Sequence, residues 1–238
     1  MRVHRALALA GVASRRAAES LVAEGRVSVN GERAIVGQLV GPADVLAVDG
    51  AQVRDPEQLR AYLLNKPAGV VSTAHDPQGR PTVIDEVPSE VRVYPVGRLD
   101  LDTTGALLVT NDGELAARLM HPSSKAPKTY EALMRGQVSA ETVRRLRRGV
   151  ELEEGMTAPA RVHRMDRRAA GGTWLELELI EGRNRQVRRM GDAVGHPVMR
   201  LHRSRYAGLG LARLAPGRWR PITRAEWTRL GELVGLER

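Results

Sequence analysis

The sequence predicts an α+β protein in which a mixed, mostly antiparallel sheet forms a large domain, preceded by a small α/β domain. Its predicted strands occur in runs without a regular crossover helix between consecutive strands, which is typical of antiparallel pairing. The chain has 238 residues, of which 42% are hydrophobic, so it can bury a substantial core in one or two domains. No internal repeat of fixed period is present.

The small domain is expected over residues 1–54. Apolar spacing favours a short helix over residues 3–10, and Ser14 is a suitable N-cap for a second helix that ends before Gly25. Two short strand-and-turn units follow, with Asn30-Gly31 and Asp49-Gly50 as their hairpin signals. Two helices and a small sheet are therefore predicted.

The large domain is expected over residues 61–238, after a polar joint at residues 55–60. Its predicted strands are apolar or alternating segments, at residues 61–64, 91–96, 106–109, 129–134, 160–165, 174–180 and 198–201. Its predicted helices have apolar residues at helical spacing, at residues 114–120, 140–148, 184–194 and 224–234.

Charge and composition restrict the function classes. The net charge is +9, and residues 183–205 contain seven Arg and a single acid, Asp192. Such a concentrated basic segment predicts binding to a polyanion, and it lacks the apolar face that a membrane-surface helix needs. The chain has no Cys, which excludes disulfides and thiolate metal sites, and no apolar run long enough for a membrane span. A cytoplasmic protein is expected.

Residues 97–105 (GRLDLDTTG) place carboxylates in a glycine-bounded turn between two predicted strands, and TNDG follows at residues 110–113. Two further blocks, KTYE at residues 128–131 and EGRNRQVRRM at residues 181–190, follow in order. Together these blocks resemble the bacterial ribosomal-RNA pseudouridine synthases of the family typified by the small-subunit enzyme. The resemblance covers essentially the whole chain and implies the pseudouridine synthase fold.

The N-terminal segment carries a second resemblance. ASRR at residues 13–16 and GRVSVNG at residues 25–31 are similar to the RNA-binding module named after ribosomal protein S-four. That resemblance implies that Arg15, Arg16 and Arg26 lie along RNA phosphates.

The family resemblance also implies a catalytic set. Asp100, in the triplet Arg-Leu-Asp, corresponds to the catalytic aspartate, which acts as a nucleophile or a base on the sugar. Tyr130 corresponds to a tyrosine that stacks on the flipped uracil. Arg188 corresponds to the basic residue that keeps the aspartate ionised and oriented. The isomerisation involves no redox change and needs neither a metal nor a cofactor.

Further residues are expected at the RNA or around the catalytic turn. Arg98 and Thr104 are expected to shape the loop and its RNA contacts, and Asp102 to brace the turn. The remaining expected RNA contacts belong to the basic block, where Asn184 would also cap the following helix: Arg183, Asn184, Arg185 and Arg189.

Two other functions match parts of the sequence. Residues 100–104 (DLDTT) also match a signature of magnesium-dependent phosphatases, but no apolar strand leads into Asp100 and no later acidic pair is present. A non-catalytic rRNA-binding ribosome-assembly factor would retain both basic surfaces without needing Asp100 or Tyr130. The presence of both residues favours the enzyme.

The expected partner is ribosomal RNA, alone or in assembly intermediates, and no obligate protein partner is indicated. Residues 75–83 (HDPQGRPTV) and 119–123 (LMHPS) look more like the large-subunit (23S) enzymes of the family than the small-subunit (16S) ones. The 23S rRNA is therefore the expected substrate, with 16S rRNA as the alternative.

Overall fold

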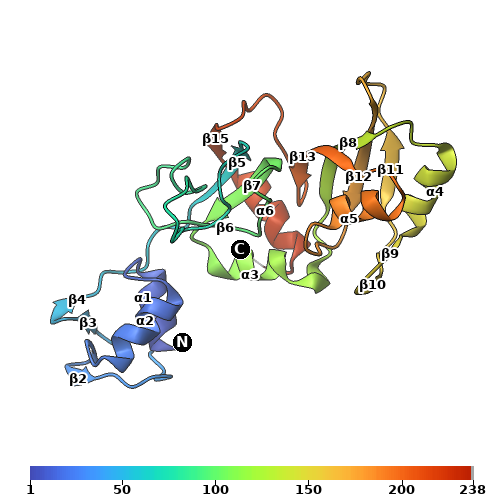
Figure 1. The fold of residues 1–238 in the computed structure, drawn as a ribbon. Helices are drawn as coiled ribbons and strands as arrows, with labels where there is room; N and C mark the ends of the chain where they lie inside the picture. The colour runs from blue at the N-terminus through green and yellow to red at the C-terminus, as the bar shows by residue number, and fades with distance from the viewer. Residues whose placement is uncertain (237–238) are drawn as a thin grey trace. The chain divides into compact units, whose positions relative to one another are not determined.

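The computed structural model describes residues 1–236, whose ribbon is shown in Figure 1. Contacts divide the chain into two compact units. One comprises Met1–Leu59 and Ser89–Arg92, and the other comprises Arg60–Pro88 and Val93–Arg238.

The N-terminal unit contains helices α1 (Val3–Leu9) and α2 (Arg15–Ala23) and a four-stranded sheet of order β2-β1-β3-β4. Ser14 caps α2, because its Oγ accepts a hydrogen bond from the Ala17 amide at 3.1 Å. The four strands are short: β1 (Val27–Val29), β2 (Glu32–Arg33), β3 (Leu46–Val48) and β4 (Ala51–Gln52). Both predicted hairpin turns have positive φ at their two central residues, as tight type I′ turns require. The two helices and small sheet are confirmed.

The larger unit is built on a nine-stranded sheet whose main path runs β11-β12-β8-β13-β7-β5-β15. Strand β6 pairs with β7 and β14 pairs with β13 at its sides. The strands are β5 (Ala61–Lys66), β6 (Tyr94–Pro95), β7 (Thr104–Thr110), β8 (Lys128–Arg135), β11 (Arg161–Arg164), β12 (Gly172–Leu179), β13 (Val198–Tyr206), β14 (Leu209–Gly210) and β15 (Trp219–Pro221). A separate two-stranded hairpin is formed by β9 (Glu151–Leu152) and β10 (Gly155–Met156).

Nearly all strand pairs are antiparallel, which confirms the predicted class. The parallel pair joins β13 to β7, with His202 opposite Thr104 and Arg203 opposite Gly105. Gly105 has φ of +116°, and a Cβ there would lie 2.2 Å from the Arg203 carbonyl oxygen. Only glycine therefore allows the two strands to approach each other so closely beside the turn that carries Asp100.

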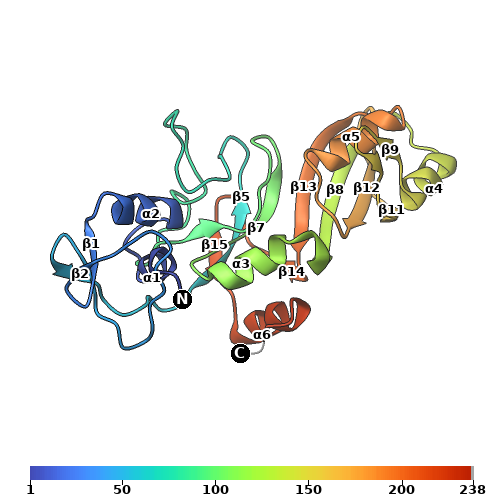
Figure 2. The same cartoon turned by 90° about the horizontal axis from the view of Figure 1, so that it is seen from below.

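The helices cover two halves of this sheet with separate cores (Figures 1 and 2). Helices α3 (Gly113–Met120) and α6 (Arg224–Leu233) bury Leu115, Leu119 and Leu230 against the half that contains β5 and β7. Helices α4 (Ala140–Arg148) and α5 (Gln186–Ala193) cover the half that contains β8 and β12. A short 3₁₀ helix, η1 (Pro122–Ser124), follows α3. Figure 2 shows β13 and β8 side by side.

Three sequence predictions differ from the structure. The strand expected over residues 91–96 is reduced to β6, because Val91 lies in a bend, residues 92–93 have no regular structure, and Pro95 has no amide proton for a ladder. The helix expected over residues 184–194 begins two residues later, at Gln186. The strand expected over residues 198–201 continues to Tyr206 as β13. No helix within residues 1–236 is long and apolar enough to span a membrane.

Candidate active site

A cleft of about 660 Å³ opens in the larger unit, around the turn that carries Asp100. It is lined by residues 72–74, 94–98, 119–122 and 180–185 and by the side chains of Asp100, Lys128, Tyr130, Arg203 and Tyr206. A smaller cavity of about 70 Å³ shares Asp100, Tyr130 and Arg185 with this cleft. The carboxylate and the ring that the sequence singled out therefore face the same space.

The Asp100 turn is fixed on both sides by hydrogen bonds. It is closed by the Thr103 amide, which donates to the Asp100 carbonyl at 3.1 Å. On the preceding side, the buried Ser72 hydroxyl accepts from the Leu99 amide at 3.1 Å and donates to the Leu99 carbonyl at 2.9 Å. The Gly69 amide donates to the Leu101 carbonyl at 2.8 Å. The residues on either side of Asp100 are thus held by the segment that follows β5.

Lys66 also fixes this turn, through hydrogen bonds to backbone carbonyls. Its side chain is fully buried at the end of β5, and its Nζ donates to the carbonyls of Pro67 and Thr103 at 2.9 Å and of Leu101 at 3.4 Å. Burial lowers the pKa of Lys66 to about 8, although Asp102 and Asp100 act in the opposite direction. Two of its three carbonyl partners belong to the turn, so this ammonium fixes the turn's backbone.

Two arginines from the start of α5 reach the carboxylates of the turn. Arg185 Nη1 lies 3.3 Å from Asp100 Oδ2 and donates a hydrogen bond to it. Arg188 Nε lies 3.8 Å from the same oxygen, while its Nη2 lies 2.8 Å from Asp102 Oδ2. Arg188 was expected to pair with Asp100, and it does so at ion-pair distance, but its closer partner is Asp102. Arg185, expected at a phosphate, makes the shorter contact to Asp100.

Another part of the cleft lining is aromatic and cationic. Tyr130 is half-buried on β8, beside the α4/α5 core. Arg203 is 3% exposed, donates from Nε to the Ala106 carbonyl at 2.7 Å, and lies 4.7 Å over the Tyr206 ring. Lys128 Nζ donates to the Ala126 carbonyl, and burial together with the Arg203 charge lowers the pKa of Lys128.

Two residues predicted at the loop have different surroundings. Arg98 is exposed and lines the cleft, and it makes no ion pair within the part of the chain that the structure describes. Thr104 does not line the cleft. Its hydroxyl instead lies 2.8 Å from His202 Nδ1 on the adjacent strand β13.

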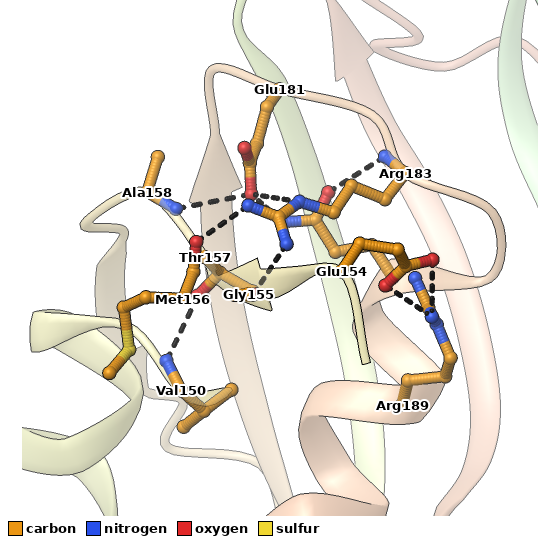
Figure 3. Close-up of polar contacts among 10 residues, drawn as sticks. Val150, Glu154, Gly155, Met156, Thr157, Ala158, Glu181, Arg183 and Arg189 are labelled. Atoms are coloured by element: carbon orange, nitrogen blue, oxygen red, sulfur yellow. Dashed lines mark hydrogen bonds and ion pairs between the residues drawn. The ribbon is translucent and has the colours of Figure 1, made fainter. Parts of the chain in front are cut away.

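Two other arginines of the basic block contact the protein itself. The Arg183 guanidinium donates to the Gly155 and Met156 carbonyls, both at 2.6 Å, and Arg189 Nη1 lies 2.8 Å from both carboxylate oxygens of Glu154. All three partners belong to the β9–β10 hairpin (Figure 3).

The predicted cap at Asn184 is wrong. The residue that precedes α5 is Arg185, whose backbone is left-handed, with φ of 47° and ψ of 34°, and whose side chain makes no capping bond. The Gln186 side chain instead closes the turn over residues 183–186, because its Oε1 accepts a hydrogen bond from the Arg183 amide at 3.0 Å. Asn184 is exposed and lines the cleft.

The predicted RNA contacts of the N-terminal unit lie on its surface. Arg15 and Arg16 are exposed in the first turn of α2. Arg26 is also exposed, but it forms a two-pronged contact with Asp49, at 2.9 Å and 2.6 Å, and a 3.4 Å contact with Glu24. Arg26 is therefore paired with Asp49 and Glu24, whereas Arg15 and Arg16 do not contact these two carboxylates.

Sequence reasoning missed two residues that fix the turn, Lys66 in its buried role and Ser72, and it missed the buried Arg203 in the lining of the cleft. A signal was available for Arg185, because a spacing of three places it on the same helix face as Arg188. No comparable spacing links Ser72 to Leu99. Within residues 1–236, no group of His, Asp and Glu side chains is arranged to hold a metal ion.

Comparison with known proteins gives concordant matches. Residues 60–193 match the family described as RNA pseudouridylate synthase, and residues 1–46 match the S4 domain. The chain is 46% identical over 239 residues to "Ribosomal large subunit pseudouridine synthase B" of Bacillus subtilis, covering 98% of this chain and 96% of that protein. It is 43% identical over 243 residues to an "Uncharacterized RNA pseudouridine synthase" of Aquifex aeolicus, covering 100% and 96%. A crystal structure of a pseudouridylate synthase superposes with a TM-score of 0.69 at 27% identity, covering 97% of this chain and 99% of that one.

Proposed function

Because the chain belongs to the RNA pseudouridylate synthase family, we propose that it isomerises a specific uridine of 23S ribosomal RNA to pseudouridine. The observation that carries the choice of RNA is the likeness, over 98% of this chain, to a relative named for the large ribosomal subunit. A ribosomal substrate would place the protein in the cytoplasm.

The reaction breaks the bond between uracil N1 and ribose C1′ and forms a bond between C5 and C1′. The C5 proton is lost and N1 gains a proton, so the change balances without an oxidant or reductant. Asp100 lines the cleft and is assigned the first step, either as a nucleophile at C1′ or as a base on the ribose. Both roles need a carboxylate held at a fixed position. The bonds that Ser72, Gly69 and Lys66 make to the neighbouring backbone support that assignment.

The neighbouring side chains are assigned supporting roles. Tyr130 shares both cavities with Asp100, so its ring can stack on a uracil that has left the RNA helix. Arg185 and Arg188 orient the Asp100 carboxylate through charge-assisted contacts. Arg98 and Asn184, exposed at the cleft, are assigned to RNA contacts. Thr104 is assigned to shaping the loop, through its contact with His202.

The two domains are assigned separate tasks. Residues 1–54 form the RNA-binding domain, where the S4 match and the exposed Arg15 and Arg16 support contacts with phosphates. Arg26 is assigned to the same surface. Residues 61–238 form the catalytic domain, which contains every residue assigned to chemistry.

The test is to map pseudouridines in ribosomal RNA from cells with and without the gene, by carbodiimide modification and primer extension. Loss of a pseudouridine from 23S rRNA, restored by the wild-type gene but not by the Asp100→Asn gene, is the expected result. Loss from 16S rRNA would keep the chemistry and change the substrate. An unchanged map in both RNAs would contradict the proposal and favour an rRNA-binding assembly factor.

A further inference from the structure

The loop that carries Arg185 to Asp100 is tied to the β9–β10 hairpin, whose residues lie outside the cleft. Figure 3 shows Arg183 extending from this loop to the hairpin, where it donates to the Gly155 and Met156 carbonyls at 2.6 Å each. Two donor groups of this planar guanidinium are therefore occupied by backbone carbonyls of the protein itself.

Glu181 is the first residue of this loop, which runs from Glu181 to Gln186, and its carboxylate makes contacts at both ends of it. Its Oε1 accepts from the Ala158 amide at 3.1 Å, just beyond the hairpin, and also from the Gln186 side-chain amide. Arg183 Nε lies 3.4 Å from the same carboxylate oxygen. The Gln186 Oε1 in turn accepts from the Arg183 amide. Both ends of the segment from Glu181 to Gln186 are thus fixed through groups that contact the hairpin region.

The hairpin is itself anchored to the folded unit. The buried Thr157 hydroxyl accepts from the Val150 amide at 3.0 Å, and the Thr157 amide donates to the Val150 carbonyl at 2.9 Å. The hairpin is also joined to α5, because Arg189 Nη1 donates to the Glu154 carboxylate at 2.8 Å. This hydrogen bond to Arg189 lowers the pKa of Glu154.

Arg185 has a backbone conformation that calls for such support. It adopts the left-handed region at φ of 47°, which is unfavourable for a residue with a Cβ and persists where the surroundings impose it. The anchored Gln186 follows it directly, and the anchored Arg183 lies two residues before it. The strained residue is also the one that donates to Asp100.

We propose that Arg183 is a positioning residue, which uses the β9–β10 hairpin as a scaffold to hold Arg185 against Asp100, and that Arg189 fastens the same hairpin to α5. Neither arginine then serves as an RNA-phosphate contact, the role that their sequence block suggested. This inference rests on the proposed isomerase activity. The two roles differ in measurable ways, because a phosphate contact contributes to binding and to its salt dependence, whereas a positioning residue contributes to the rate of the bound complex.

The experiment compares full-length wild type, Arg183→Gln and Arg183→Lys on 23S rRNA transcripts. It measures kcat at saturating RNA, Kd as a function of salt, and the melting temperature. For Arg183→Gln we expect kcat to fall by at least about tenfold, since small misplacements of reacting groups are costly. Kd and the slope of log K against log salt should stay at wild-type values. Losing a phosphate contact would instead reduce that slope by about 0.7 to 0.9.

The lysine variant separates charge from geometry. It keeps the charge but loses the planar fork, so kcat should remain well below wild type, whereas a phosphate contact would be largely restored. It also carries the test if Arg183→Gln does not fold. Arg144→Gln is the matched control, because Arg144 is exposed on α4, outside the cleft, and pairs with Glu141. Its kcat and Kd should equal those of wild type.

For Arg189 the partner is changed instead. Glu154→Gln removes the charge that faces Arg189, and we expect RNA affinity and its salt slope to be unchanged. Tighter RNA binding with a steeper slope would show that Glu154 withholds Arg189 from phosphate and would overturn its assignment. For Arg183, a weaker Kd with a reduced slope and an unchanged kcat would overturn the inference, as would wild-type values throughout. If wild type forms no pseudouridine on any rRNA, the proposed function itself fails.

Discussion

Lys66→Met tests whether a buried ammonium supports the turn that carries Asp100. Methionine preserves most of the side-chain length but removes the donors that serve the carbonyls of Pro67, Leu101 and Thr103. Lys66 is fully buried, and its pKa is lowered from 10.5 to about 8. The difference in free energy of unfolding between wild type and variant should therefore depend on pH in a way that Lys66 alone causes.

The sign and size follow from proton linkage. Between about pH 8 and 10.5 the unfolded chain binds more protons at this lysine than the folded chain does, so the free energy of unfolding rises with pH. Between about pH 7 and about pH 9.5, the lowered pKa of Lys66 raises the free energy of unfolding of wild type by about 2 kcal/mol. The variant lacks this increase. Other titratable groups, such as Lys128 and Tyr206, are present in both proteins and cancel in the difference.

The assay is urea unfolding of both proteins at the two pH values, with pseudouridine formation measured near neutral pH. We expect wild type to become more stable relative to Lys66→Met by about 2 kcal/mol in unfolding free energy at the higher pH. We also expect kcat of Lys66→Met to fall about tenfold or more while RNA affinity changes only a few-fold. A difference that does not change with pH would refute the buried-ammonium reasoning. An unchanged kcat would refute the role of Lys66 in fixing the turn.

Three further outcomes are expected. Asp100→Asn should abolish isomerisation in a transcript assay while RNA affinity stays within a few-fold, and measurable turnover would contradict the catalytic assignment. Deleting residues 1–54 should weaken binding to folded rRNA in a filter-binding assay, and unchanged affinity and modification would show that this domain has another task. Glu226, paired with Arg220 at 2.6 Å, has a pKa lowered to about 2, so it stabilises the fold above about pH 4.5 and loses that contribution as the pH falls toward 2. Glu226→Gln should therefore cost about 2 kcal/mol in urea unfolding near pH 7, after allowance for solvent screening at the partly exposed Arg220, and little near pH 2.

The parts of the fold that depend on local signals were predictable from the sequence. The cap at Ser14 and the two Asx-Gly turns act within a few residues, so their residue types are enough to place them. The strand expected over residues 91–96 failed because an apolar run does not show whether a partner strand is available. Strand β7 pairs with Tyr94 and Pro95 and accepts a hydrogen bond from the Val96 amide, but it does not pair with residues 91–93.

For the candidate site, the sequence offered motif residues but not the geometry around them. Family motifs indicated Asp100, Tyr130 and Arg188, and the structure brings the first two to one cleft with Arg188 beside Asp100. The cap at Asn184 was mispredicted because α5 begins one position later than the motif suggests, with Arg185 in a left-handed conformation at the position that precedes the helix. The bonds from Lys66 to Thr103 and from Ser72 to Leu99 span 37 and 27 residues. Contacts of that range depend on how strands pair, and no local pattern encodes them.

The distribution of arginines shows why net charge alone was a poor guide to this surface. The seven arginines of residues 183–205 predicted a track for a polyanion. Five of them contact the protein itself: Arg183, Arg185, Arg188, Arg189 and Arg203. Only Arg200 and Arg205 of this block are exposed and outside these contacts. The basic block therefore places most of its guanidinium groups around the Asp100 turn and its supporting hairpin. Long-range attraction to RNA remains, because these seven arginines outnumber the acids that pair with them, namely Asp100, Asp102, Glu154 and Glu181.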